Sequence, residues 1–311
     1  MPKSADKKKR DKRRHHQRQT RSQLPAGAFR APSVKRELAG MFRVLDQVIQ
    51  ETRNALLAEP GAASDEARFD RAVLARALNI LEAEQVLLPV AHWEAASGLA
   101  RQLFELLVNI EEISRHDDPS KARLRYGKFG ILQQARKRLR MVEYSRDTGR
   151  PAHDEFEAEL DSLLSSPDFN EFKQSNGRWQ DYWSGKSVRL LASESESEMR
   201  PHQYEHLFRR WSEEAHAAPS TIIREMFRGQ SQESWIDDVL EEDQKEIGEV
   251  LTMTVVLFLD LEEALPHAPS LSWEQKLAWT DALMDETRKN GWAQRGGITP
   301  IAFEAPSAAT D

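Results

Sequence analysis

The hydrophobic residues of this chain recur every three or four positions, a spacing that places them on one face of an α-helix. The first such segment runs from Val34 to about Ala58, after Pro32 and Ser33, which are typical of a helix start. Its apolar positions are Leu38, Met41, Phe42, Leu45, Val48 and Ile49. No segment alternates apolar and polar residues as a half-buried strand does. The pattern therefore predicts an all-α fold, a multi-helix bundle.

Breaks in the same pattern divide the rest of the chain. Ser64 or Asp65 can cap a second helix that ends near Leu88, where Pro89 interrupts the pattern. Further helices are predicted over residues 92–115, 119–146, 154–164, 186–196, 201–228, 234–265 and 272–290. Residues 167–185, rich in aromatic and turn residues, are predicted to form a packed connector. We therefore expect a disordered basic arm over 1–33, one helical domain over 34–290 and a loose tail over 291–311.

The longest apolar run, from Val250 to Leu259, is about half of the roughly 20 residues that span a bilayer, and two threonines interrupt it. It predicts a buried helix, with no membrane contact. The chain has no cysteine, which excludes disulfides and thiolate zinc sites, and the N-terminal region lacks the apolar segment of a secretory signal. These features favour a reducing cytoplasm.

The net charge of −7 conceals a strong asymmetry along the chain. Residues 1–36 carry 13 Lys/Arg against Asp6 and Asp11, a net of +11, so that the remainder carries a net of −18. The basic residues of the arm that resemble a nucleic-acid-binding tail are Lys7, Lys8, Lys9, Arg10, Lys12, Arg13 and Arg14. RNA or another nucleic acid is the expected partner of this arm. The alternatives are a solubilising tail that lies against the acidic body, or a nuclear address in a eukaryotic host.

One stretch, residues 209–216, combines residue types that suit phosphate chemistry. At about 100° per residue, Arg209, Ser212 and His216 share one helical stripe next to an apolar one. Arginine can hold a phosphodiester with two hydrogen bonds, and histidine moves a proton near neutral pH. Ser212 can orient the imidazole or the phosphate. The alternative is a hydrogen-bonded structural cluster beside the core.

Two family resemblances bear on this stretch. The first is carried by Trp183-Ser184-Gly185-Lys186-Ser187-Val188-Arg189, by Tyr204, by Ser212-Glu213-Glu214-Ala215-His216 and by Ala100-Arg101-Gln102-Leu103-Phe104-Glu105. These motifs resemble an all-helical bacterial family known only as a domain of unknown function, over roughly residues 35–265. The resemblance implies that Arg101 and Glu105, four residues apart, support the site together with Tyr204. A purely structural ion pair between Arg101 and Glu105 is the alternative.

The second resemblance is to HEPN domains, whose ribonuclease members carry arginine, four to six residues, and then histidine. Both Arg209 and Arg210 have this spacing to His216, but the residue after the arginine differs from the Asn, Asp or His that is frequent there. The resemblance implies a metal-independent ribonuclease or toxin of bacterial stress or phage defence, with no cofactor and with an active site completed across a homodimer. Because seven residues return almost to the same helical azimuth, Arg209 is the better placed arginine. The competing hypothesis is a non-enzymatic module that binds nucleic acid through its arm and a protein through its acidic body.

Two other groups of residues are weaker candidates for ligand-binding sites. Ser184, Gly185, Lys186 and Ser187 end like the phosphate loop of NTPases, but the glycine required five positions before Gly185 is Gln180. A helix-entry loop capped by Ser184 is predicted instead, although its backbone amides remain able to receive a phosphate.

The acidic residues around His116 are predicted to form a solvated helix end and not a metal site. They are Glu111, Glu112, Asp117 and Asp118.

Overall fold

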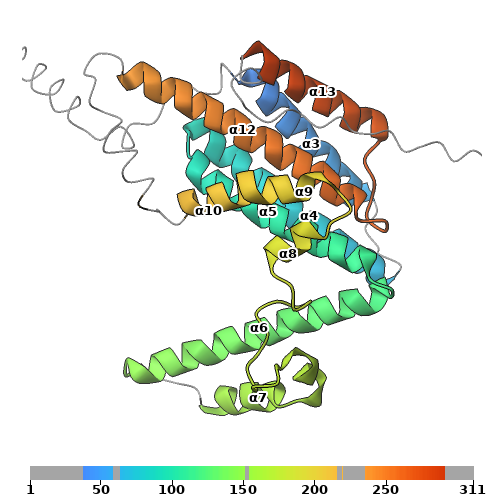
Figure 1. Ribbon diagram of the computed structural model, residues 1–311, viewed down its shortest axis with the longest axis vertical. Helices are drawn as coiled ribbons and strands as arrows, with labels where there is room; N and C mark the ends of the chain where they lie inside the picture. The colour runs from blue at the N-terminus through green and yellow to red at the C-terminus, as the bar shows by residue number, and fades with distance from the viewer. Residues whose placement is uncertain (1–37, 59–63, 151–153, 216–218, 220–234, 291–311) are drawn as a thin grey trace, which may run out of the picture.

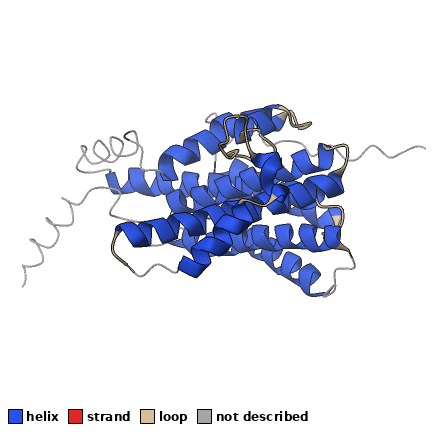
Figure 2. Ribbon diagram, turned by 90° about the horizontal axis from the view of Figure 1, so that it is seen from below, coloured by secondary structure: helices blue, strands red, loops and turns tan. Residues whose placement is uncertain are grey.

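The computed structural model describes residues 38–58, 64–150, 154–215, 219 and 235–290. In these ranges the chain is helical, and the sole strand-like feature is an isolated bridge between Lys173 and Trp179 (Figure 2). The prediction of an all-α fold is thereby confirmed. The predicted basic arm (1–33), the predicted C-terminal tail (291–311) and His216 lie outside the described residues.

Five helices pack side by side and form the main bundle (Figure 1). They are α3 (Ala39–Ala58), α4 (Asp65–Leu87), α5 (Trp93–Arg115), α12 (Trp235–Glu263) and α13 (Trp273–Lys289). A short 3-10 turn, η2 (Leu88–Val90), joins α4 to α5. The α5 face that enters the core is built from Ala100, Leu103, Phe104, Leu107 and Val108, all at most 1% exposed. Their three- and four-residue spacing explains why this segment is a helix and why it lies at the centre.

The bounds of these helices agree with the expected capping chemistry. The Ser64 side chain accepts a hydrogen bond from the Ala67 amide and so caps α4, as predicted. Ser272 caps α13 in the same way. The apolar run of residues 250–259 lies in α12 and is largely buried against the other helices, which confirms that prediction. Within the described ranges, no helix is long and apolar enough to cross a membrane.

Helix α6 (Pro119–Asp147) leaves the bundle, and α7 (Asp154–Leu164) returns along its far half (Figure 1). Asp118 caps α6 by accepting a hydrogen bond from the Lys121 amide, and Pro119 suits the first helical position. The 3-10 segment η3 (Pro167–Phe172) then packs onto the near half, where Phe172 meets Phe129 at 5.2 Å between ring centroids. Among the described elements, α7 is therefore the one that packs along the second half of α6.

The chain re-enters the bundle through four short consecutive elements that contact α5. They are α8 (Val188–Ser193), α9 (Met199–Gln203), η4 (Tyr204–Phe208) and α10 (Arg209–Ala215). The prediction of one regular helix from 201 is wrong at η4, which is a π-helical turn. A π-turn holds one residue more than an α-turn, and here it stacks the Tyr204 ring on Phe208, with centroids 5.2 Å apart.

Candidate functional site

Arg209, the predicted catalytic arginine, is exposed but already has an anionic partner. Its side chain is 61% exposed and bonds the Glu205 carboxylate, four residues earlier, at 2.7 Å. Arg189 approaches the same carboxylate at 4.0 Å. The hydrogen bond from Arg209 lowers the pKa of Glu205 below its ordinary value. A phosphate at Arg209 must therefore compete with this carboxylate.

Arg210 is held more firmly and serves the packing of α10 on α12. Its guanidinium bonds Glu246 at 2.5 Å and Glu249 at 2.8 Å. Burial alone would lower the Arg210 pKa, but these two carboxylates outweigh it and raise the pKa above its ordinary value. Arg210 is therefore already paired with two carboxylates of α12.

Ser212 uses its hydroxyl locally. It donates a hydrogen bond to the Phe208 carbonyl at 2.7 Å, a common arrangement for serine inside a helix. His216, the predicted proton-transfer residue, follows α10 and lies outside the described residues. The described part of the predicted stripe, Arg209 and Ser212, is therefore engaged in contacts within its own helix.

Two of the three predicted supporting residues, Arg101 and Tyr204, contact the Phe208 ring, which directly precedes Arg209 in the sequence. The Arg101 guanidinium lies 4.5 Å from the centroid of the Phe208 ring, and Tyr204 stacks on the same ring. Glu105 has a different neighbour: after burial, its negative charge is the second cause that raises the pKa of Tyr126. The structure thus brings Arg101 and Tyr204 together around Phe208, as a cation and an aromatic stack between α5 and the π-turn.

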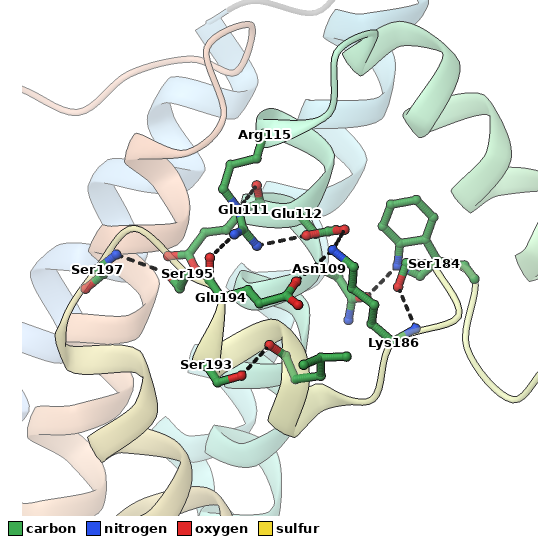
Figure 3. A network of polar contacts seen from close by, with 12 residues as sticks. Asn109, Glu111, Glu112, Arg115, Ser184, Lys186, Ser193, Glu194, Ser195 and Ser197 are labelled. Atoms are coloured by element: carbon green, nitrogen blue, oxygen red, sulfur yellow. Dashed lines mark hydrogen bonds and ion pairs between the residues drawn. The ribbon is translucent and has the colours of Figure 1, made fainter.

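The segment that resembles a phosphate loop instead ties the connector to α5 (Figure 3). The Lys186 ammonium bonds Glu112 at 2.6 Å and Glu194 at 2.8 Å, and these hydrogen bonds raise its pKa. Ser184 accepts a hydrogen bond from the Lys186 amide, and Gly185 adopts the left-handed conformation at φ 76°. The prediction that Ser184 caps the following helix is wrong, because Ser187 caps α8 by accepting a hydrogen bond from the Leu190 amide.

Trp183 anchors the same segment. Its side chain is 4% exposed, and its indole nitrogen donates to the Asn109 side-chain oxygen at 2.6 Å. Asn109 lies one helical turn before Glu112 on α5, so the indole and the Lys186 ammonium dock onto the same stretch of that helix. Lys186, the cation of the Ser184–Ser187 segment, is already paired with Glu112 and Glu194 and is therefore not free to bind a phosphate.

The acidic cluster at the end of α5 is likewise neutralised by cations. Arg200, whose side chain is 6% exposed, bonds both Glu111 and Asp260 at 2.8 Å. Arg115 pairs with Glu112 at 2.8 Å and also bonds the Glu194 carbonyl. In the part of the chain that the structure describes, no cluster of acidic, histidine or cysteine side chains has a geometry that fits a metal ion.

A pocket of about 310 Å³ opens beside this cluster. It is lined by Glu112, Arg115, His116, Asp117 and Lys186. Lys186 and Arg115 both use their cationic groups on Glu112, so the pocket presents a nearly balanced set of charges. The arrangement favours a structural ion-pair network over an anion-binding site.

A different surface carries cations without carboxylate partners, and it lies on α6. The helix contains nine Lys/Arg residues against Glu143 and Asp147, a net charge of +7. In its first half three of the four cations have carboxylate partners: Arg123 meets Asp70 at 3.4 Å, and Arg125 and Lys128 meet Glu171 at 3.2 and 3.8 Å. The pattern changes beyond Leu132.

We name the exposed stripe of the second half the α6 basic face and define it by Gln133, Arg136, Lys137, Arg140 and Tyr144. These positions recur at three- and four-residue intervals, so their side chains share one side of the helix, away from the buried Ala135 and Val142. Over the described ranges, Arg136, Lys137 and Arg140 have no carboxylate partner. The sequence reasoning did not single out this surface as a candidate site.

The signal was present in the sequence. Residues 133–140 read Gln-Gln-Ala-Arg-Lys-Arg-Leu-Arg, a local charge density close to that of the N-terminal arm. The segment was correctly predicted to be helical, but whether its charges are neutralised depends on which helix packs against it. Only the return path of α7 shows that the basic side remains open.

Comparisons with known proteins place the chain beside one family. A family model described as a family of unknown function, DUF5677, matches residues 71–234. No curated protein and no solved structure matches the chain. The matched range includes α6 and the Trp183–Arg189 motif, and it supports the first resemblance proposed from the sequence. The comparisons contain no support for a similarity to HEPN domains.

Proposed function

The chain belongs to the DUF5677 family of unknown function, and we propose that it is a non-enzymatic module that binds nucleic acid through the α6 basic face. The observation that carries the proposal is the set of three cations, Arg136, Lys137 and Arg140, that have no carboxylate partner among the described residues. Such cations can exchange their counterions for phosphates without first breaking an ion pair.

The distribution of charge supports a polyanion as the ligand. Outside residues 1–36 the chain carries a net charge of −18, yet α6 alone carries +7. A local positive field on an acidic body attracts an anion to one place and repels it elsewhere. The N-terminal region of residues 1–36, with a net charge of +11, supplies a second set of cations that can follow the phosphate backbone.

The test is the double variant Lys137→Ala/Arg140→Ala. Both side chains are exposed, so the fold is expected to persist. If each cation neutralises one phosphate of a duplex, the slope of log K against log salt falls in magnitude by about 1.8. Fluorescence anisotropy with labelled nucleic acid between low and high salt measures this slope.

A matched control is Arg288→Ala/Lys289→Ala at the end of α13. These residues are exposed, carry the same two charges and pair with Asp285 and Glu286. We expect the control to bind as the parent protein does. Equal slopes for the parent, the α6 variant and the control would reject the proposal.

We also propose, as a second candidate, the HEPN-like metal-independent ribonuclease centred on Arg209 and His216. The observation that favours it is the π-turn directly before an exposed arginine, because such turns are frequent at functional sites. In this reaction His216 exchanges a proton with the ribose 2′-hydroxyl, and Arg209 stabilises the phosphorane.

Separate variants test this candidate. His216→Ala and Arg209→Ala are expected to abolish RNA cleavage in the presence of a metal chelator, while circular dichroism stays unchanged. His206→Ala, an exposed histidine of the π-turn, serves as the matched control and is expected to keep the activity. Cleavage that survives in His216→Ala would eliminate the enzyme hypothesis.

A further inference from the structure

We infer that the ligand of the α6 basic face is duplex DNA and that α6 enters its major groove. This inference rests on the proposed function and specifies its partner. It starts from shape: an α-helix with side chains is about 10–12 Å across, and the major groove of B-DNA is about 12 Å wide. A helix can enter the groove only if most of its circumference is free of neighbouring elements.

The far half of α6 meets this requirement. Figure 1 shows α6 leaving the bundle with α7 alongside. Arg138 lies over the Phe156 ring of α7 and Arg146 pairs with Glu157 of α7, while Ala135 and Val142 are buried in this half of α6. Gln133, Gln134, Lys137, Arg140 and Met141 are all exposed on the rest of the circumference. The open arc is therefore wide enough to bring side chains to a groove floor and to the phosphates on its walls.

The order of residue types around this arc matches the order of groups in the groove. At about 100° per residue, Gln133, Lys137 and Arg140 lie near the middle of the arc, Gln134 lies on one flank and Arg136 on the other. Glutamine presents a donor and an acceptor that fit the adenine edge, and arginine presents two donors that fit guanine. The flanking Arg136 suits a phosphate on the groove wall.

The charge along α6 limits the contact to one segment. Glu143 and Asp147 are the acidic residues of the helix, and both are exposed near its C-terminal end. They repel phosphates there. Residues 133–140 span about 10 Å along the helix axis, which corresponds to about three base pairs of B-DNA. The segment thus offers a short recognition stretch, as a groove-bound helix does.

The same face fits other nucleic acids less well. Single strands are held by aromatic platforms on which bases stack. The aromatic residue of the α6 basic face is Tyr144, and the Arg150 guanidinium takes one face of its ring at 5.8 Å. Duplex RNA has a major groove that is too deep and narrow for a helix to read. Duplex DNA is therefore the form that the shape and the chemistry of this face favour together.

The experiment measures how much of the binding depends on α6. The parent protein and Lys137→Ala/Arg140→Ala are titrated with a 20-base-pair DNA duplex, one of its strands, the matching RNA duplex and vesicles rich in anionic lipid. Comparing the two proteins cancels binding by the N-terminal arm. We expect the variant to lose at least about tenfold in affinity for the DNA duplex and less than about threefold for the other three probes.

Each outcome has a defined meaning. An equal or larger loss with the single strand or the RNA duplex would overturn the DNA inference and keep the proposed function. A loss with vesicles alone would overturn both and identify a membrane surface as the partner. No loss with any probe would overturn both as well.

A second variant tests the groove contact itself. Gln133→Ala/Gln134→Ala removes no charge, so its affinity for a random duplex and its salt slope are expected to equal those of the parent. In a selection from a random duplex library, we expect the parent to enrich a short sequence and the variant to lose roughly tenfold of that preference. Enrichment of the same sequence by both proteins would reject major-groove reading by α6.

Discussion

Helices α6 and α10 are both rich in arginine, but their arginines have opposite surroundings. In α10, Arg209 is paired with Glu205, and Arg210 is paired with Glu246 and Glu249. In the far half of α6, Arg136 and Arg140 have no such partner in the described structure. An arginine that is already paired joins helices, whereas an arginine without a partner can attract a ligand. Residue type alone therefore does not identify a phosphate site; the neutralising partner decides.

The contrast also exists within α6. Its first half faces η3 and the bundle, where Asp70 and Glu171 neutralise Arg123 and Arg125. Its second half faces α7 on one side and is open on the other. The same helix thus changes from a packing element to a candidate binding element where the bundle ends, and the following predictions test that difference.

The largest loss of stability is expected for Arg200→Ala, because Arg200 is the most buried of the paired arginines described above. Its loss leaves Glu111 and Asp260 in a poorly solvated site without their cation, and burial already raises the pKa of Asp260. Removal of one partner from such a pair costs about 3–5 kcal/mol. Urea unfolding measures the change. Arg209→Ala, an exposed pair, is the control, and equal midpoints for the two variants would contradict this view of α9 and α10.

Glu84 shows the effect of burial on an acidic side chain, because it is fully buried. Burial raises its pKa well above the ordinary value of 4.5, and its partner is the Thr254 hydroxyl at 3.0 Å. The folded protein then keeps a proton that the unfolded chain releases, so stability falls as pH rises above about 4.5 until the folded pKa is reached.

The measurement is the free energy of unfolding of the parent minus that of Glu84→Gln, which cannot titrate. Over the pH interval that begins at about 4.5, the ordinary pKa, this difference is expected to fall as pH rises, with a slope of at most about 1.4 kcal/mol per pH unit. A difference that does not change over this interval would show that Glu84 is ionised in the folded protein.

An intermediate effect is expected for Arg210→Ala. The change removes the Arg210 ion pair from Glu246, whose side chain is 8% exposed, but Arg210 itself is 37% exposed and water screens part of the interaction. We expect a loss of about 1–2 kcal/mol in urea unfolding. Arg210→Lys, which keeps the charge, is expected to recover part of it; a loss as large as that of Arg200→Ala would contradict the ranking by burial.

The smallest effect on stability is expected for Lys137→Ala/Arg140→Ala. Neither side chain has an ion pair to lose within the described residues, and both are exposed. The free energy of unfolding should therefore change by less than about 0.5 kcal/mol, even though nucleic-acid binding is expected to weaken. A loss above about 1 kcal/mol would mean that the α6 basic face contributes to folding.

The fold was predictable because apolar spacing and capping residues act locally. Residues 154–164 were predicted as a helix with the bounds that α7 has, and Ser64 was predicted as a cap. The π-turn was not predictable, because it accompanies the packing of Tyr204 and Phe208 against Arg101, a residue of another helix.

The candidate site was less predictable, for the same reason. Glu205 lies four residues before Arg209, so that pair was visible in the sequence. The partners of Arg200 and Lys186 come from helices distant in the sequence, and no local pattern indicates them. The role of His216 stays a prediction, since that residue lies outside the described ranges.

The π-turn also sets the rotational phase between two parts of one continuous helical stretch. Because the π-turn takes up one extra residue, winding the same residues as a regular α-helix would turn α10 by about 100° relative to α9. Arg200 on one side of the turn and Trp211 on the other, both at most 5% exposed, could then no longer face the interior at the same time. A chain of this family that lacks one residue here can therefore wind as a regular α-helix and keep both contacts.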